Sequence, residues 1–167
     1  FNFEGKRRSL LAQQSLETLQ QYGAAVVALP NDQLQRALGA TTRLEQALDA
    51  SNQFLLVILQ QLTAMLADTG LINMDFNDFL SVIKQPGLAL AGATETEQEQ
   101  DLPAALQQLL LNPLLQPAQL SQAKAALLHI VAGDDFSLQQ FEALGQQLAA
   151  ELPNVSLLLQ GLTLLPG

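Results

Sequence analysis

One segment constrains the fold of this sequence more than any other: the helical pattern that runs from about Thr42 to Asp68. Apolar residues recur there at helical spacing, namely Leu44, Ala47, Leu48, Leu55, Ile58, Leu62 and Leu66. A helix of more than roughly six turns is longer than most helices of globular proteins. The pattern therefore predicts a central helix that lies between two structural units, and Gly70 follows its end.

The segments on either side of this helix predict an α/β protein. Before it, we expect a helix over about 5–22, a short buried parallel strand over 24–29, and a short helix over 32–38 that Asn31 can cap and Gly39 closes. After it, we expect helices over about 75–84, 103–111 and 137–151, strands over 88–91, 124–132 and 155–160, and a solvated acidic loop over 92–101.

Charge and composition exclude several classes of function. The net charge is −9 with only 7 basic residues, which argues against direct binding to nucleic acid. The chain has no cysteine and one histidine, so disulfides, thiolate metal sites and multi-histidine metal sites are excluded. No signal peptide opens the sequence, and Gln, Asp or Gly interrupts its apolar runs. We therefore expect a cytoplasmic protein without direct membrane insertion and without a metal site.

A short polar loop follows the long helix, with the sequence Gly70-Leu-Ile-Asn73-Met-Asp75-Phe-Asn-Asp78-Phe79. Asp75 and Asp78 are three residues apart, so both carboxylates would lie on one helical face and could act on one water molecule or one cation. In the simpler interpretation, Asn73 or Asp75 is a helix N-cap and Asp78 is an acid in the first turn. Spacing alone favours the simpler interpretation.

The wider sequence favours the first interpretation, because this loop resembles the synergy loop of the FtsZ family, bacterial relatives of tubulin. In that family Asn-x-Asp-Phe-x-Asp follows a long central helix. Other segments resemble the family in the same order, namely Phe1-Asn-Phe-Glu4-Gly-Lys-Arg-Arg8, Pro30-Asn31-Asp32-Gln-Leu34, Asn112-Pro-Leu-Leu115, Ala132-Gly133-Asp-Asp135, Leu138 and Phe141-Glu142. The resemblance covers nearly the whole chain.

The resemblance implies a fold and a domain organisation. Residues 1–41 would be a remnant of a Rossmann-like GTP-binding domain, residues 42–69 the central helix, and residues 70–167 the α+β C-terminal domain of sheet and helices. The glycine-rich phosphate loop of the family would lie before Phe1. The closing strand of the C-terminal domain and the tail that recruits partners would lie after Gly167. We therefore expect a fragment of a larger protein.

The resemblance also implies a site that two subunits share. In the family, GTP is held by one subunit, and the synergy loop of the next subunit completes the site. Asp75 and Asp78 would then be catalytic acids that orient or polarise water, with Asn73 as a supporting contact. The implied cofactor of the complete protein is GTP or GDP, with or without Mg²⁺, and none is expected for the fragment. Such a head-to-tail contact does not close, so it builds a filament.

Four residues match nucleotide-contacting positions of the family: Glu4 at the ribose, Arg8 at a phosphate, and Asn31 and Asn52 at the guanine. Each has an ordinary alternative. Glu4 and Arg8 are four residues apart and could form a helix ion pair, Asn31 could cap a helix, and Asn52 could face solvent. One position departs from the family, since Leu48 stands where a Phe usually stacks on the base.

Two functions follow from these residues. In the first, the chain belongs to a cytoskeletal GTPase of bacterial cell division that polymerises with itself or another FtsZ at the division ring, and the chain is inactive alone. Division adaptors would bind through the tail. In the second, it is a divergent, non-catalytic FtsZ-like protein that modulates or caps filaments. Leu48 motivates the second function, as does the loop after Gly92, which has Thr94 and acidic residues where the family is richer in glycine. His129 is expected to be a half-buried strand histidine.

Overall fold

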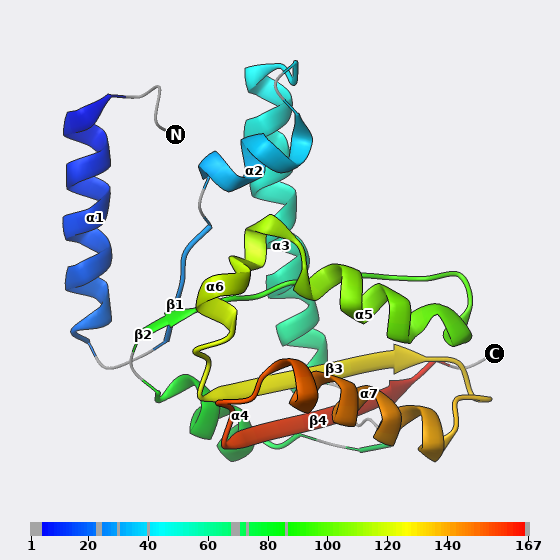
Figure 1. The fold of residues 1–167 in the computed structure, drawn as a ribbon. Helices are drawn as coiled ribbons and strands as arrows, with labels where there is room; N and C mark the ends of the chain where they lie inside the picture. Colours follow the sequence, from blue (N-terminus) through cyan, green and yellow to red (C-terminus); the bar gives the residue numbers. More distant parts are fainter. Residues whose placement is uncertain are drawn as a thin grey trace.

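The computed structural model describes residues 5–22, 25–29, 31–39, 41–67, 71–72, 74–85 and 87–165. Its elements are α1 (Lys6–Gln20), β1 (Ala25–Val27), α2 (Asn31–Leu38), α3 (Leu44–Ala67), α4 (Phe76–Ile83), β2 (Gly87–Ala89), η2 (Glu99–Asp101), α5 (Leu102–Leu110), η3 (Pro113–Leu115), α6 (Pro117–Leu120), β3 (Ala125–Ala132), α7 (Leu138–Glu151) and β4 (Leu157–Leu164) (Figure 1). Helices and strands are mixed along the chain, so the predicted α/β class is confirmed.

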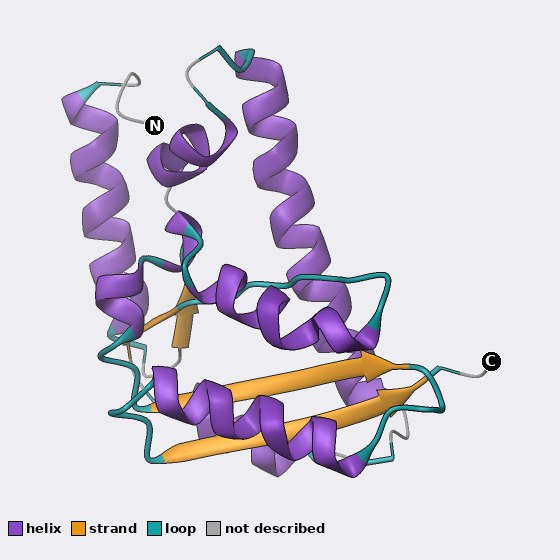
Figure 2. Cartoon of the chain, turned by 45° about the vertical axis from the view of Figure 1, so that its right-hand side comes forward, coloured by secondary structure: helices purple, strands orange, loops and turns teal. Residues whose placement is uncertain are grey.

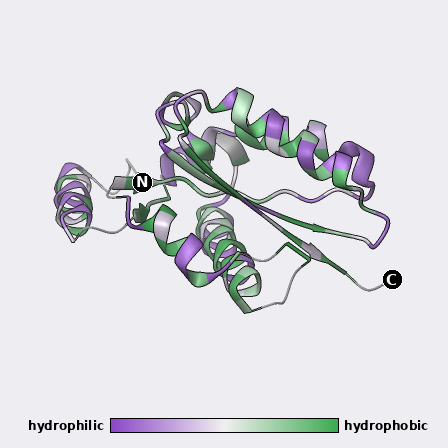
Figure 3. Cartoon of the chain, turned by 90° about the horizontal axis from the view of Figure 1, so that it is seen from below, coloured by the Kyte–Doolittle hydropathy of each residue, from purple (hydrophilic) through white to green (hydrophobic). Residues whose placement is uncertain are grey.

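The best-packed part of the protein is the C-terminal half. β3 and β4 pair in parallel along their whole length, from Ala125 opposite Leu157 to Ala132 opposite Leu164. α5 and α7 lie on one side of this pair, whereas α3 and α4 lie on the other (Figures 2 and 3). Apolar side chains of α5, α7, β3 and β4 and of the segments that join them form the core, namely Leu106, Leu110, Ile130, Ala132, Phe136, Leu144, Leu148, Leu152 and Leu162.

The N-terminal half is more open. α1 contacts β1 but buries none of its own side chains, and it stands apart from α3 in both side views (Figures 1 and 2). α2 packs against α3 and η3, and Gly39 ends it with a φ of 96°, a conformation that glycine adopts at little cost. The prediction that Gly39 closes this helix is therefore confirmed.

Three expectations about strands and turns need correction. The expectation was that β1 is buried, yet Val27 is 43% exposed. β1 pairs only with β2 in a two-stranded parallel sheet, and few of the described residues cover that sheet. The last strand was expected over 155–160 but runs to Leu164, since its pairing with β3 continues past Gly161. The short helices η3 and α6 were missed, because prolines at Pro113 and Pro117 start turns too short to show a helical period.

The long helix α3 forms as predicted but is less covered than expected. Ala47, Ile58 and Met65 are buried, and several large apolar side chains are exposed. These exposed side chains are Leu44, Leu48, Leu55, Leu56, Val57, Leu59 and Leu66. By length and composition α3 could cross a membrane, with a mean hydropathy of 1.2, although the sequence predicted no such segment. The residues that the structure describes cover α3 along one side.

Candidate functional site

The loop that follows α3 is attached to the edge of the C-terminal sheet. The Ile72 N–H donates to the Leu162 carbonyl oxygen at 3.2 Å, and the Leu162 N–H donates to the Ile72 carbonyl oxygen at 3.1 Å. These two bonds form an isolated antiparallel bridge between the loop and β4. Met74, two residues further, is buried with 7% exposure. The loop is therefore packed onto β4 immediately before Asp75.

Asp75 and Asp78 meet at the start of α4 in a capping box. The Asp78 N–H donates to Asp75 Oδ1 at 2.7 Å, and the Asp75 N–H donates to Asp78 Oδ2 at 3.3 Å. The structural interpretation is thus confirmed for Asp75 as the N-cap and for Asp78 as a first-turn acid. Both residues are exposed, and the residues that the structure describes leave one oxygen of each carboxylate unengaged.

Two of the remaining predicted site residues cannot be placed. Asn73 and Glu4 lie outside the described residues. The roles of Asn73 as a cap or supporting contact, and of Glu4 at the ribose or in an ion pair with Arg8, stay predictions. Arg8 lies exposed on α1. Among the described residues, no group of three or more His, Asp and Glu side chains is arranged to hold a metal ion.

The structure brings together the segments that carry Asn31 and Asn52. Asn31 begins α2, and its side-chain oxygen accepts a hydrogen bond at 3.1 Å from the hydroxyl of Ser51, on α3. This bond connects α2 to Ser51, the residue before Asn52. The Asn52 side chain is exposed. Leu48 lies one turn before Asn52 on the same side of α3 and is also exposed. Sequence reasoning missed the Ser51 contact, because it joins two separate helices.

The two sets of candidate residues lie at opposite ends of the protein. α2 and the N-terminal part of α3 are at one end, and α4 with the β3–β4 sheet is at the other (Figure 1). Between Asn52 and the end of α3 at Ala67, the helix advances by roughly 22 Å at 1.5 Å per residue. Asp75 and Asp78 lie beyond that end. One chain therefore does not bring Asn52 and the acid pair to the same small molecule.

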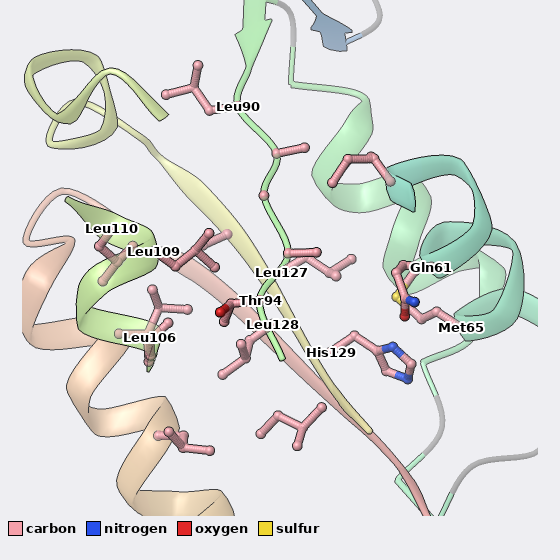
Figure 4. Close-up of a pocket in the computed structure, with 18 of the residues that line it drawn as sticks. Gln61, Met65, Leu90, Thr94, Leu106, Leu109, Leu110, Leu127, Leu128 and His129 are labelled. Carbon is pink, nitrogen blue, oxygen red and sulfur yellow. The ribbon is translucent and has the colours of Figure 1, made fainter. Parts of the chain in front are cut away.

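An open groove is lined by residues of α3, β2, β3, α5 and α7, so it extends to both sides of the β3–β4 sheet. Its volume is about 2430 Å³, and its labelled lining includes Gln61, Met65, Thr94, Leu127 and His129 (Figure 4). The sequence did not reveal the groove, since its walls come from segments far apart in the chain. His129 is half-buried as predicted, and its Nε2 lies 3.1 Å from the Thr163 hydroxyl on β4.

The acidic loop that begins at Gly92 has two structural contacts that the sequence did not predict. Glu99 accepts a hydrogen bond from the Gly133 N–H at 2.9 Å, which holds the loop against the end of β3. A Cβ at Gly92 would lie 2.9 Å from a methyl group of Leu109, so the chain packs closely against α5 there and a larger residue would require that side chain to move. Both contacts describe local packing rather than a binding site.

Comparison with known proteins gives a consistent result. Residues 87–165 match the model of the FtsZ family, C-terminal domain. The cell division protein FtsZ of Wigglesworthia glossinidia brevipalpis is 33% identical over 147 residues, which cover 88% of this chain and 38% of that protein. The FtsZ of Coxiella burnetii is 32% identical over 150 residues, which cover 90% of this chain and 39% of that protein.

Solved structures agree with these matches. An empty FtsZ dimer from M. jannaschii superposes with a TM-score of 0.84 at 28% identity, covering 100% of this chain and 48% of that chain. A mutant FtsZ from the same organism gives a TM-score of 0.83 at 29% identity, covering 98% of this chain and 49% of that chain. The chain thus spans 38% and 39% of these two relatives and 48% and 49% of these two solved chains.

Proposed function

Because this chain carries the C-terminal domain of the FtsZ family in residues 87–165, we propose that it belongs to an assembly-dependent GTPase of cell division. The observation that carries the proposal is the placement of the acid pair and the Asn31–Asn52 region at opposite ends of the protein. A single chain cannot apply both to one GTP, whereas two chains stacked head-to-tail can. Such a contact continues into a filament, and one similar FtsZ structure is a dimer.

The acid pair suits the chemistry of GTP hydrolysis. Phosphoryl transfer needs a positioned water and a stabilised charge more than it needs covalent catalysis. The capping box holds the Asp75 and Asp78 carboxylates in a fixed relation, and both are exposed at the surface that would face a neighbour. Their unengaged oxygens can accept hydrogen bonds from a water molecule and orient it toward the γ-phosphate. Asn73 would add a supporting contact.

The other end of the chain would hold part of the nucleotide. Asn31 and Asn52 would contact the guanine, while Glu4 and Arg8 would contact ribose and phosphate, with GTP or GDP bound with or without Mg²⁺. Leu48 covers the base without stacking on it, which costs on the order of 1 kcal/mol relative to an aromatic residue. The protein would act in the bacterial cytoplasm at the division ring, with adaptors that bind through the C-terminal tail.

The test is GTP turnover by the protein in its full natural length, measured against protein concentration. Two variants remove charge but keep the helix cap: Asp75→Ser retains a preferred N-cap, and Asp78→Gln retains the capping box. We expect turnover that rises above a threshold concentration and falls by about 100-fold or more in either variant. The matched control is Asn77→Ala, an exposed neighbour on the same helix, which should keep its turnover. Normal turnover in both charge-removing variants would refute the proposal.

A second candidate function rests on the exposure of the acid-pair surface. The 167-residue chain presents Asp75 and Asp78 while spanning 38% of a relative's length. Added as a polypeptide to FtsZ filaments, it should join one end and block growth there, as a non-catalytic modulator would. The test is sedimentation of FtsZ filaments with substoichiometric amounts of the 167-residue chain, and we expect less polymer in the pellet. An unchanged pellet would exclude the capping function.

A further inference from the structure

The exposed position of the acid pair raises the question of what holds it in place. The capping box fixes Asp75 and Asp78 relative to each other, but not relative to the rest of the protein. The residues just before Asp75 provide that attachment. Ile72 is bonded to Leu162 through two backbone hydrogen bonds, and Met74 is buried next to Asp75. The orientation of the start of α4 therefore depends on how this short segment packs on β4.

The segment packs on β4 at Gly161, the residue before Leu162. We call this packing position the seat of the loop. A Cβ built at Gly161 would lie 3.5 Å from the Ile72 carbonyl oxygen and 3.7 Å from Met74 Cε. It would also lie 3.3 Å from Cδ2 of His129, the neighbour of Gly161 across the β3–β4 pair. Gly161 is buried, and a one-carbon side chain there would be in van der Waals contact with the loop and in tighter contact with the His129 side chain on β3.

From these contacts we propose that Met74 is a positioning residue for the acid pair, with Gly161 as its seat. The proposal rests on the GTPase function proposed above. Met74 touches no nucleotide. It acts by filling the space over Gly161, so that the chain leaves β4 in one direction and presents Asp75 and Asp78 to the neighbouring subunit. The C-terminal sheet would thereby set the geometry of a site that lies outside it.

Substitutions at Met74 separate this role from general stability. In the full-length protein, Met74→Ala removes the side chain that fills the seat, whereas Met74→Leu nearly conserves its volume. We expect Met74→Ala to lower kcat for GTP by about 10- to 100-fold, because small displacements of a catalytic group have effects of that size. The KM for GTP and the threshold concentration for assembly should stay unchanged, and Met74→Leu should restore most of the turnover.

The matched control is Leu71→Ala, in the same loop but 69% exposed, which should behave as the wild type. Hydrogen exchange provides a second measurement on the same proteins. In Met74→Ala, amides over 74–79 should exchange faster while those of β3 and β4 keep their protection. Faster exchange throughout the protein, or loss of assembly together with turnover, would show a general structural role and overturn the inference.

The outcomes distinguish this inference from the function on which it rests. If Asp75→Ser and Asp78→Gln lose turnover while Met74→Ala keeps it, the GTPase proposal stands and the positioning role of Met74 is refuted. If the two aspartate variants keep turnover, the GTPase proposal fails, and the positioning role fails with it. A second variant, Gly161→Val, approaches the same contact from β4 and should reproduce the loss of kcat. Normal turnover in Gly161→Val would exclude Gly161 as the seat.

Discussion

At the scale of single residues, Asp75 and Asp78 each have two uses. Their side chains satisfy backbone N–H groups at the start of α4 and also place two carboxylates at an exposed surface. These uses do not compete, because a carboxylate has two oxygens and the cap engages one of them. A capping residue can therefore be a catalytic candidate as well, and the two roles are separable by mutation.

Stability measurements on the 167-residue chain would isolate the capping role. Asp75→Ala removes the acceptor for the Asp78 N–H and should lower the free energy of unfolding by about 1 kcal/mol. Asp75→Ser keeps an acceptor and should stay within a few tenths of a kcal/mol of the wild type. Urea unfolding measures both. Equal losses in the two variants would contradict the assignment of Asp75 as the N-cap.

A second residue-scale prediction concerns Gly145 on α7 and Gln160 on β4. A Cβ at Gly145 would overlap the amide group of Gln160, whose Oε1 is buried without a hydrogen-bond partner among the described residues. Gly145→Ala should therefore force the Gln160 amide to move, and this cost should offset the gain of about 1 kcal/mol that alanine brings to a helix. The cost should shrink in a Gln160→Ala background, which a double-mutant cycle would detect. Additive effects would contradict direct contact between the two sites.

At the scale of elements, α3 has the most unusual environment. Its buried side is narrow, and its exposed apolar side has the composition of a covered surface. The relatives compared above extend well beyond the part that this chain matches, so further protein is available in them to cover that side. If this chain is part of a protein of that length, the additional residues would pack against this side of α3.

This inference predicts a dependence on chain length. Leu59 is 61% exposed, so Leu59→Gln should change the stability of the 167-residue chain by less than about 0.5 kcal/mol. In the full-length protein the same substitution should cost about 1 kcal/mol or more, because it would place an amide in an apolar interface. Ile58→Ala, at a buried neighbour, should cost about 2–5 kcal/mol in both lengths. An equally small effect of Leu59→Gln in both lengths would show that this side stays exposed.

At the scale of the whole molecule, the separation of the two candidate sets predicts complementation between inactive variants. A full-length Asp78→Gln protein should still bind GTP, and an Asn52→Ala protein should still present its acids. When the two proteins are mixed in equal amounts and assemble at random, about a quarter of the head-to-tail junctions would pair a normal nucleotide end with a normal acid end. Turnover should rise above that of either protein alone.

The control for this experiment is a mixture of Asp75→Ser and Asp78→Gln. Both lack a carboxylate at the same end, so no junction between them is complete and turnover should stay low. Recovery in that control would indicate that acids from two different chains act at one junction. No recovery in the Asp78→Gln and Asn52→Ala mixture would show that both ends act within one chain, against the arrangement described here.

The sequence by itself determined most of the elements and the family resemblance. Apolar spacing located α1, α3 and α7 to within a few residues, and Asp75 could be proposed as a cap, because these features depend on neighbours within one or two turns. β4 was placed less well. From their neighbours alone, Gln160 and Gly161 indicate the end of a strand. The strand continues beyond them because it pairs with β3.

The tertiary structure alone decided how the site is arranged. The bond between Asn31 and Ser51, the bridge between Ile72 and Leu162, and the seat of Met74 over Gly161 all join residues far apart in the chain. The separation of the acid pair from the Asn31–Asn52 region follows from the straight path of α3 between them. Local periodicity carries no information on such contacts, because they form only when whole helices and strands pack against one another.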